Sequence, residues 1–304
     1  HVLLTDLAIA HGYCGQPRRS VALLGKTLDD WNNGRVNAGN LGNLAFFEIS
    51  LGELAAAEQH QRGALDVTSA DEALEKGYGQ LRLGLILTYT GRFTEAAREF
   101  RTALAIMQRE RDPRSECHLW TYRGIRAQLL GDLHLALVCA RRAHRLADAS
   151  GNQRQRVRSA DLFASVWLSH AEHEPEAARR RRILEAAETL LSEAMVRCRQ
   201  LDLVELEAGI LLHRAQWHRA MGNLEEARRA AGEGLLIADR CEYRIQAADI
   251  HNFFALLALE GGQPEVARQE ALLGEACSLC DGEPHAYSSG LKQAQAILER
   301  IARI

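Results

Sequence analysis

The sequence predicts an all-α fold, a right-handed solenoid of about seven antiparallel helix pairs with a C-terminal capping helix. One observation behind this prediction is that apolar residues recur three and four positions apart, as at Leu81, Leu85 and Tyr89. This is the spacing of an amphipathic helix. A second observation is a turn glycine followed by small residues, which returns about every 40 residues and indicates stacked helical repeats. Strand-like alternation is not found anywhere in the sequence.

A glycine stands where the first helix of most predicted pairs should end. A tight turn between two helices needs a residue that tolerates a positive φ, and glycine does so without steric cost. The residues predicted to fill this position are Gly15, Gly52, Gly91, Gly131 and Gly222, and the same frame returns at Gly262.

Small residues mark the places where two paired helices should approach most closely. A larger side chain at such a position would overpack the contact between the helices. On the first helices these residues are Ala8, Ala45, Gly84, Gly124, Ala215 and Ala255.

The repeat is irregular after Gly131, because the interval to Gly222 is long enough for two pairs. We expect the extra unit at about residues 156–200, with His173-Glu174-Pro175 replacing the glycine turn and a long second helix at 176–199. The turn signal at 280–284 leads into an amphipathic helix at about 288–304, which should cap the stack. Residues 1–304 are therefore predicted to form a single superhelical domain.

One repeat resembles the tetratricopeptide repeat (TPR) family through Gly84, Tyr89, Gly91, Ala96, Phe100 and Ala103. The repeats here are longer than the usual 34 residues and lack the terminal proline of that family. Pairs of this length resemble those of kinesin light chains and of sensor regions in STAND signal-transduction ATPases, including maltose-regulon-type activators. The latter resemblance implies a ligand-sensing C-terminal region of a bacterial signalling ATPase or transcription regulator. An NTPase domain would then precede residue 1 in the same polypeptide.

Composition limits the kinds of partner. The 37 basic and 40 acidic residues give a net charge of −3, so nucleic acid is an unlikely partner on charge grounds. The longest apolar stretches are much shorter than the roughly 20 residues that cross a bilayer, so no membrane span is expected. Seven cysteines without a disulfide-like arrangement favour a cytoplasmic protein. The start carries no leader and lacks an initiator Met, and we expect the chain to be part of a longer protein.

Local motifs give no support for catalysis, so we expect no enzyme activity, cofactor or metal. Residues 20–27 nearly match a phosphate-binding loop, but the first glycine is replaced by Ser20 and no strand precedes the segment. Cys277, Cys280 and His285 supply too few ligands for a closed zinc site. His170 and His173 are expected in a solvated loop.

The dense basic run is Arg179 to Arg182. Glutamates four residues away can balance it on a solvated helix face, which is the interpretation we favour. Arg154, Arg156 and Arg158 upstream keep open an alternative, a nucleic-acid-associated regulator that uses a basic patch. A free-standing TPR scaffold protein is a further alternative.

We expect a protein or peptide ligand in the concave groove, which the first helices of successive pairs should line. Aromatic and arginine side chains are typical of binding surfaces because they offer large contact areas with polar tips. The residues predicted to face the groove are Tyr78, Arg82, His118, Tyr122, Phe163, His213, Gln216 and Asn252. No Lys/Asn clamp for a C-terminal carboxylate is recognisable, which disfavours binding of chaperone tails.

Overall fold

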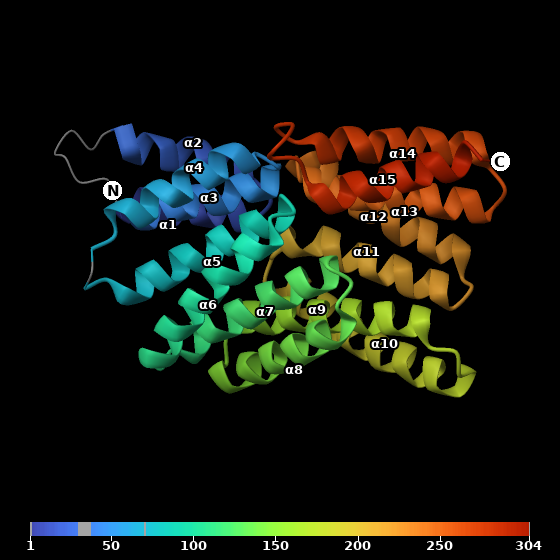
Figure 1. The fold of residues 1–304 in the computed structure, drawn as a ribbon, viewed down its shortest axis with the longest axis horizontal. Helices are drawn as coiled ribbons and strands as arrows, with labels where there is room; N and C mark the ends of the chain where they lie inside the picture. The colour runs from blue at the N-terminus through green and yellow to red at the C-terminus, as the bar shows by residue number, and fades with distance from the viewer. Residues whose placement is uncertain (1, 30–37, 70, 304) are drawn as a thin grey trace.

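A computed structural model describes residues 2–29, 38–69 and 71–303, and in these residues the chain is helical without strands (Figure 1). The helices form seven antiparallel pairs and one final helix, which confirms the predicted α-solenoid. The first pairs are α1 (Val2–Tyr13) with α2 (Pro17–Asp29), α3 (Ala38–Leu51) with α4 (Leu54–Val67), α5 (Ala73–Tyr89) with α6 (Phe93–Arg109), and α7 (Pro113–Leu129) with α8 (Leu133–Ser150). The later pairs are α9 (Gln153–His173) with α10 (Ala177–Gln200), α11 (Val204–Ala220) with α12 (Leu224–Cys241), and α13 (Arg244–Glu260) with α14 (Pro264–Leu279).

The turn glycines act as predicted. Gly15, Gly52, Gly91, Gly131, Gly222 and Gly262 all have positive φ. At the end of α5 the N–H of Gly91 donates to the carbonyl of Thr88 at 3.1 Å, and the N–H of Arg92 donates to Leu87 at 2.8 Å. These two bonds form a Schellman motif, which satisfies carbonyls that the end of the helix would leave without partners.

The predicted small residues lie buried between paired helices, which confirms the register of the repeat. Ala8, Ala45, Gly84, Gly124, Ala215 and Ala255 are all buried. A Cβ atom on Gly84 would lie 2.5 Å from the Phe100 ring of the paired helix. The glycine therefore permits the close approach of α5 and α6.

Helices α9 and α10 form a long pair, and a final helix follows α14. Helix α9 has 21 residues and α10 has 24, and the connection between them is Glu174-Pro175-Glu176, since His173 is the last residue of α9. The final helix α15 runs from Ser288 to Ile301, while residue 304 of the predicted helix lies outside the described residues. It packs on α13 and α14 and so covers the last pair.

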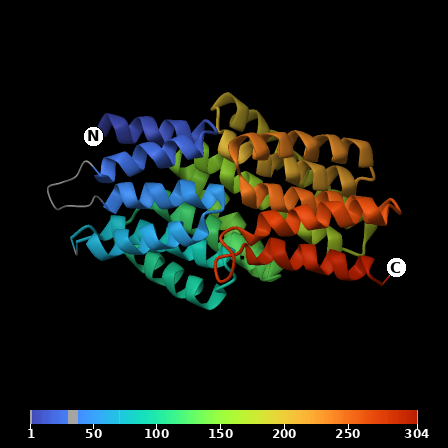
Figure 2. The ribbon, with the colours of Figure 1, turned by 90° about the horizontal axis from the view of Figure 1, so that it is seen from above.

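The superhelix closes on itself, which the repeat pattern does not predict. The C-terminal helices α13–α15 meet the N-terminal helices near the top of Figure 1, and Figure 2 shows the same meeting from above. We call this contact the seam. Its C-terminal side comprises Glu242, Arg244, Asp281, His285 and Tyr287, and its N-terminal side comprises Arg18, Gly52, Ala55, Glu58 and Tyr89.

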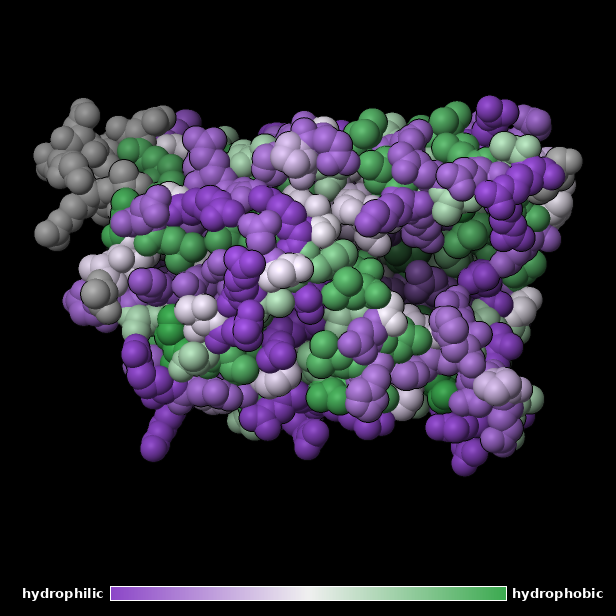
Figure 3. Space-filling model, viewed as in Figure 1, coloured by the Kyte–Doolittle hydropathy of each residue, from purple (hydrophilic) through white to green (hydrophobic). Residues whose placement is uncertain are grey.

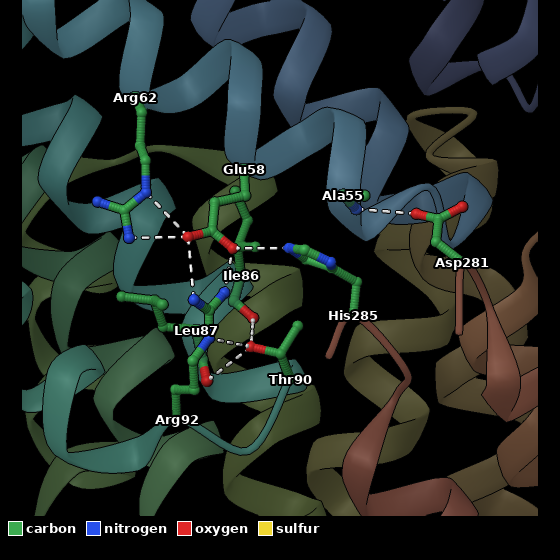
Figure 4. A network of polar contacts seen from close by, with 9 residues as sticks. All are labelled: Ala55, Glu58, Arg62, Ile86, Leu87, Thr90, Arg92, Asp281 and His285. Carbon is green, nitrogen blue, oxygen red and sulfur yellow. Dashed lines mark hydrogen bonds and ion pairs between the residues drawn. The ribbon is translucent and has the colours of Figure 1, made fainter. Parts of the chain in front are cut away.

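Polar contacts on the seam are shown in Figure 4. The N–H of Ala55 donates to the Asp281 carboxylate at 2.8 Å, and His285 lies 3.2 Å from a carboxylate oxygen of Glu58. Glu58 also pairs with Arg62 at 2.7 Å and with Arg92. Asp281 and His285 belong to the loop before α15, and Ala55 and Glu58 belong to α4. Since Arg92 follows α5 and pairs with Glu58, these contacts hold the loop against α4 and the end of α5.

The seam also has an apolar part. The rings of Tyr89 and Tyr287 pack edge to face at 5.7 Å. Ile245 and Ala248 of α13 belong to the same buried cluster as residues of α3 to α7. The two ends of the expected groove therefore meet at the seam.

Candidate functional site

Described residues of the inner face border two cavities that we compare, and the larger of these has a volume of about 470 Å³. It is bordered by the first helices α5, α7, α9, α11 and α13 and by α15. The face in Figure 3 is hollowed to the right of its centre, in the region of α11 and α13. Polar and charged residues that border this cavity include Tyr122, Arg158, Asp161, Glu205, His213, Gln216, Asp249 and Tyr287.

Two acidic side chains of the larger cavity differ in their partners. Asp161 accepts a hydrogen bond from His213 at 2.7 Å, and although burial lowers the pKa of His213, its interaction with Asp161 outweighs burial and raises it. Asp249 accepts only the hydroxyl of Tyr287, at 3.3 Å, and has no ion pair among the described residues. Burial raises the pKa of Asp249 to about 7. Asp249 is therefore an uncompensated carboxyl group facing a cavity.

A cation without a carboxylate partner borders the same cavity. Arg158 donates to the hydroxyl of Tyr122 at 2.8 Å and lies over the rings of Tyr122 and Phe46, each at 5.7 Å. In the part of the chain that the structure describes, no carboxylate is within ion-pair distance of Arg158. Among the described residues, the larger cavity is thus bordered by a cation, Arg158, and a carboxyl group, Asp249, that have no ion-pair partner.

The smaller cavity has a volume of about 350 Å³ and a different lining. Three arginines border it, Arg82, Arg114 and Arg154, together with Glu75 as the acidic side chain. Burial, together with the positive charges of Arg158, Arg154, Arg82 and Arg114, holds the pKa of His118 well below its usual value. His118 is therefore neutral at physiological pH.

The two cavities are separated by an ion pair and an aromatic stack. Arg154 pairs with the buried Glu205 at 2.7 Å and lies over the Tyr13 ring at 4.2 Å. His118 stacks on Tyr122 at 6.2 Å and meets Tyr78 edge to face at 6.0 Å. Because Glu205 and Tyr122 border the larger cavity and Arg154 and His118 the smaller, this wall belongs to both.

The predicted groove residues divide between these cavities. Tyr78, Arg82 and His118 border the smaller cavity, and Tyr122, His213 and Gln216 border the larger one. Phe163 and Asn252 lie outside both, which corrects their predicted projection.

The reason for the correction is helical geometry. Phe163 stacks on Trp167 at 5.6 Å, away from the cavity side of α9. Asn252 is fully buried and donates to the carbonyl of Gly290 at 2.9 Å, so it faces α15. The neighbouring positions Asp249 and Phe253 of α13, four residues apart, face the cavity instead.

The repeat frame contains a signal that would have found Arg158 and Asp249. Each stands six residues before a buried small residue of its helix, Ala164 and Ala255 respectively. Tyr78 and His118 hold the same position before Gly84 and Gly124. Extending this frame through the irregular unit places Arg158 on the inner face.

The remaining sequence motifs are explained by the fold. The segment 20–27 lies in α2, where backbone amides are used by the helix. His285 contacts Glu58. His170 and His173 lie in the last turn of α9 and not in the predicted solvated loop, and His170 contacts the carbonyl of Leu133 at 3.1 Å. Among the described residues no group of three or more His, Cys, Asp or Glu side chains is placed to hold a metal ion.

The basic segments do not form one patch. Arg179 to Arg182 are exposed at the start of α10, and Arg179 and Arg181 pair with Glu174 and Glu185. Arg154 stands at the start of α9, about 20–25 Å away towards the other end of this antiparallel pair. Within the described residues, no helix is both long and apolar enough to span a membrane.

Comparison with known proteins identifies the fold but no family. No family model matches the chain, and no curated protein matches it in sequence. A solved Rap protein complexed with competence and sporulation factor has a TM-score of 0.61 and 10% identity, over 99% of this chain and 88% of that one. The human IFIT1 dimer with m7Gppp-AAAA has a TM-score of 0.61 and 14% identity, over 98% of this chain and 72% of that one. At these identities the likeness supports a TPR-like helical repeat fold alone.

Proposed function

We propose that this chain is a binding module that holds a short peptide ligand in the larger cavity. The observation that carries the proposal is a partly open cavity of about 470 Å³ that Arg158 and Asp249 border without ion-pair partners among the described residues. Cavities of about 300–1,000 Å³ with a few polar groups are typical of ligand sites. A peptide offers the complementary acidic and basic groups together.

The seam argues against a large partner domain on the inner face. It joins α4 and α5 to the loop before α15, so the inner face is bordered on all sides by helices. A short segment fits this space better than a folded domain. The Rap protein, a solenoid of similar course, was solved with competence and sporulation factor bound, which supports a binding role for this architecture.

Filling the cavity tests the proposal. Gly209 borders the larger cavity, and a Cβ atom there would meet no other atom within 4 Å. Gly209→Trp should therefore place its Cβ atom without a clash and extend its ring into the cavity, and its melting temperature without peptide is measured first. Gly232 on α12 also has open space around it and lies away from both cavity linings, so Gly232→Trp is the matched control.

The measurement is the shift in melting temperature with a pool of short peptides that carry both acidic and basic side chains. We expect stabilisation of the wild type and of Gly232→Trp, and none of Gly209→Trp. Native mass spectrometry of the wild type should show the bound peptide mass. Equal responses of the two tryptophan variants would place the peptide elsewhere.

The two free charges should contribute separately to affinity. Arg158→Gln and Asp249→Asn should each weaken peptide binding about tenfold or more, because each removes a charge-assisted contact. Alanine at Tyr78, Arg82, His118 or Tyr122 should also weaken binding where the ligand reaches the wall between the cavities. Tyr122 is only 4% exposed, so its variant needs a stability measurement alongside.

A finer proposal is that this module is the ligand-sensing region of a larger cytoplasmic STAND-type ATPase or transcription regulator. Repeat pairs of about 40 residues support it. Ligand binding would then shift a closed–open equilibrium of the NTPase domain. The full-length reading frame upstream of residue 1, and peptide-dependent ATPase activity of its product, test this; a product without an NTPase domain would favour a free-standing scaffold.

The nucleic-acid alternative has one supporting observation, the IFIT1 structures solved with m7Gppp-AAAA and Gppp-AAAA. This alternative was based on a single basic patch, and the separation of Arg154 from Arg179–Arg182 argues against such a patch. Binding of a short single-stranded RNA that falls steeply with added salt would support this alternative. Absence of binding at low salt would reject it.

A further inference from the structure

The smaller cavity gathers positive charge that the described residues do not neutralise. Arg154 is paired with Glu205 at 2.7 Å, but Arg82 and Arg114 have no carboxylate within ion-pair distance in the described ranges. The polar contact of Arg82 is the side-chain oxygen of Asn43, at 3.4 Å. Glu75, the acidic side chain of the lining, is exposed and forms no ion pair with a described residue.

Other features show a space shaped around Arg82. A Cβ atom on Gly42, a buried position of α3, would collide with the guanidinium of Arg82, so the absence of a side chain makes room for it. Gln155 also borders the cavity and is 2% exposed, yet its Oε1 atom has no hydrogen-bond partner among the described residues. A buried polar atom of this kind is costly unless a ligand or water satisfies it.

We propose that the smaller cavity binds a small oxyanion, the carboxylate or phosphate group of a ligand. Arg82 and Arg114 would bind the anion directly, while Arg154 would add to the positive potential. Planar guanidinium groups donate paired hydrogen bonds to such oxygens. The site lies across the wall from the larger cavity and does not require a peptide there.

His118 provides a reporter of occupancy. Burial lowers the pKa of His118 most, and the positive charges of Arg158 and of the three arginines that border the cavity lower it further. The His118 ring also contacts the Gln155 side chain. A bound anion offsets these charges and favours the protonated imidazole. The pKa of His118, followed by its ring proton signals in NMR, should therefore rise when the anion binds.

The experiment titrates the purified chain with inorganic phosphate and, separately, with acetate, at low ionic strength. Arg82→Gln, Arg114→Gln and Gly42→Ala should each weaken binding about tenfold and reduce the rise in the His118 pKa. Gly42→Ala displaces the end of a flexible side chain and should keep the wild-type melting temperature. The control is Arg180→Gln, which removes an exposed arginine of the α10 run and should leave binding unchanged.

The outcomes distinguish a phosphate from a carboxylate ligand, and the anion site from the peptide site. Binding of phosphate alone indicates a phosphate group, and binding of acetate indicates a carboxylate. Equal binding by all variants, or loss in Arg180→Gln alone, would overturn the site. Gly209→Trp should bind the anion normally, so failure of the peptide proposal leaves this test unaffected.

Discussion

The two cavities use the same series of inner helices but differ in charge. The larger one is bordered by Arg158 and Asp249, a cation and a carboxyl group without ion-pair partners among the described residues, whereas the smaller one is bordered by three arginines and one glutamate. The position six residues before the buried small residue faces inward in successive pairs, and it changes from Tyr78 and His118 to Arg158 and Asp249. The repeat therefore fixes the positions on the inner face, while substitutions at those positions decide the chemistry.

The largest loss of stability should come from a substitution that displaces α5, because this helix borders both cavities. Helix α5 contributes Tyr78 and Arg82 to the smaller cavity and Leu85 and Tyr89 to the larger one. Gly84→Leu should lower the free energy of unfolding by roughly 1–3 kcal/mol or more, because the side chain would collide with Phe100.

Thermal melts check this prediction against Arg180→Ala, an exposed change that should stay within about 0.5 kcal/mol. Equal midpoints for the two variants would show that α5 and α6 do not pack as closely as the structure indicates.

The next largest effect should be a pH dependence of the free energy of unfolding that comes from the larger cavity and not from the smaller one. The ordinary pKa of Asp249 is 3.8, and burial raises it to about 7 in the folded chain. Between these values the unfolded chain ionises first, so this group lowers stability as pH rises towards 7 and has its full cost above that. Asp249→Asn should therefore raise the free energy of unfolding at pH 8 by on the order of 1–2 kcal/mol and have little effect near pH 4.

Melting temperatures of the wild type and Asp249→Asn across pH 4–8 measure this difference. His118→Gln, on the smaller cavity, is the comparison variant and should not reproduce the pattern. A constant difference across the range would mean that Asp249 is ionised throughout.

A smaller effect should come from the hydroxyl of Tyr287, which links the seam to the larger cavity. Tyr287→Phe keeps the packing on Tyr89 but removes the hydrogen bond to Asp249, and should cost about 0.5–1.5 kcal/mol at pH 8. In the Asp249→Asn background the loss should shrink, because the charged acceptor is gone. Chemical denaturation of the four species gives the coupling, and identical losses in both backgrounds would argue against the contact.

The smallest effect should come from the exposed part of the seam. Arg18 pairs with Glu242 at 2.8 Å across the seam, but both side chains are about half exposed. Arg18→Ala should cost no more than about 1 kcal/mol, and less in high salt. Urea denaturation at low and high salt measures it, with Arg228→Ala as a control that removes an ion pair within α12. A loss of several kcal/mol would show that this edge holds the ring closed.

Sequence reasoning was most successful where the physical cause is local. The positive φ at Gly91 and the close approach at Gly84 follow from the chemistry of those residues and their immediate neighbours. It was less successful for the direction of side chains, because an error of a few tens of degrees about the helix axis places a residue on the wrong face. Asn252 was predicted to face the groove but faces α15. Arg158 was recognised only as part of a basic segment, since the irregular unit obscured the repeat frame.

The sequence by itself determined the helix pairs, their turns, the long unit and the final helix, because each depends on residues within about one repeat. The tertiary structure alone decided that the ring closes and that two cavities form inside it. Each repeat adds a small rotation to the superhelix, and the total rotation cannot be predicted from the residues of any single repeat. That accumulated rotation brings Tyr287 against Tyr89 and Asp281 against Ala55, and so joins the two ends of the groove.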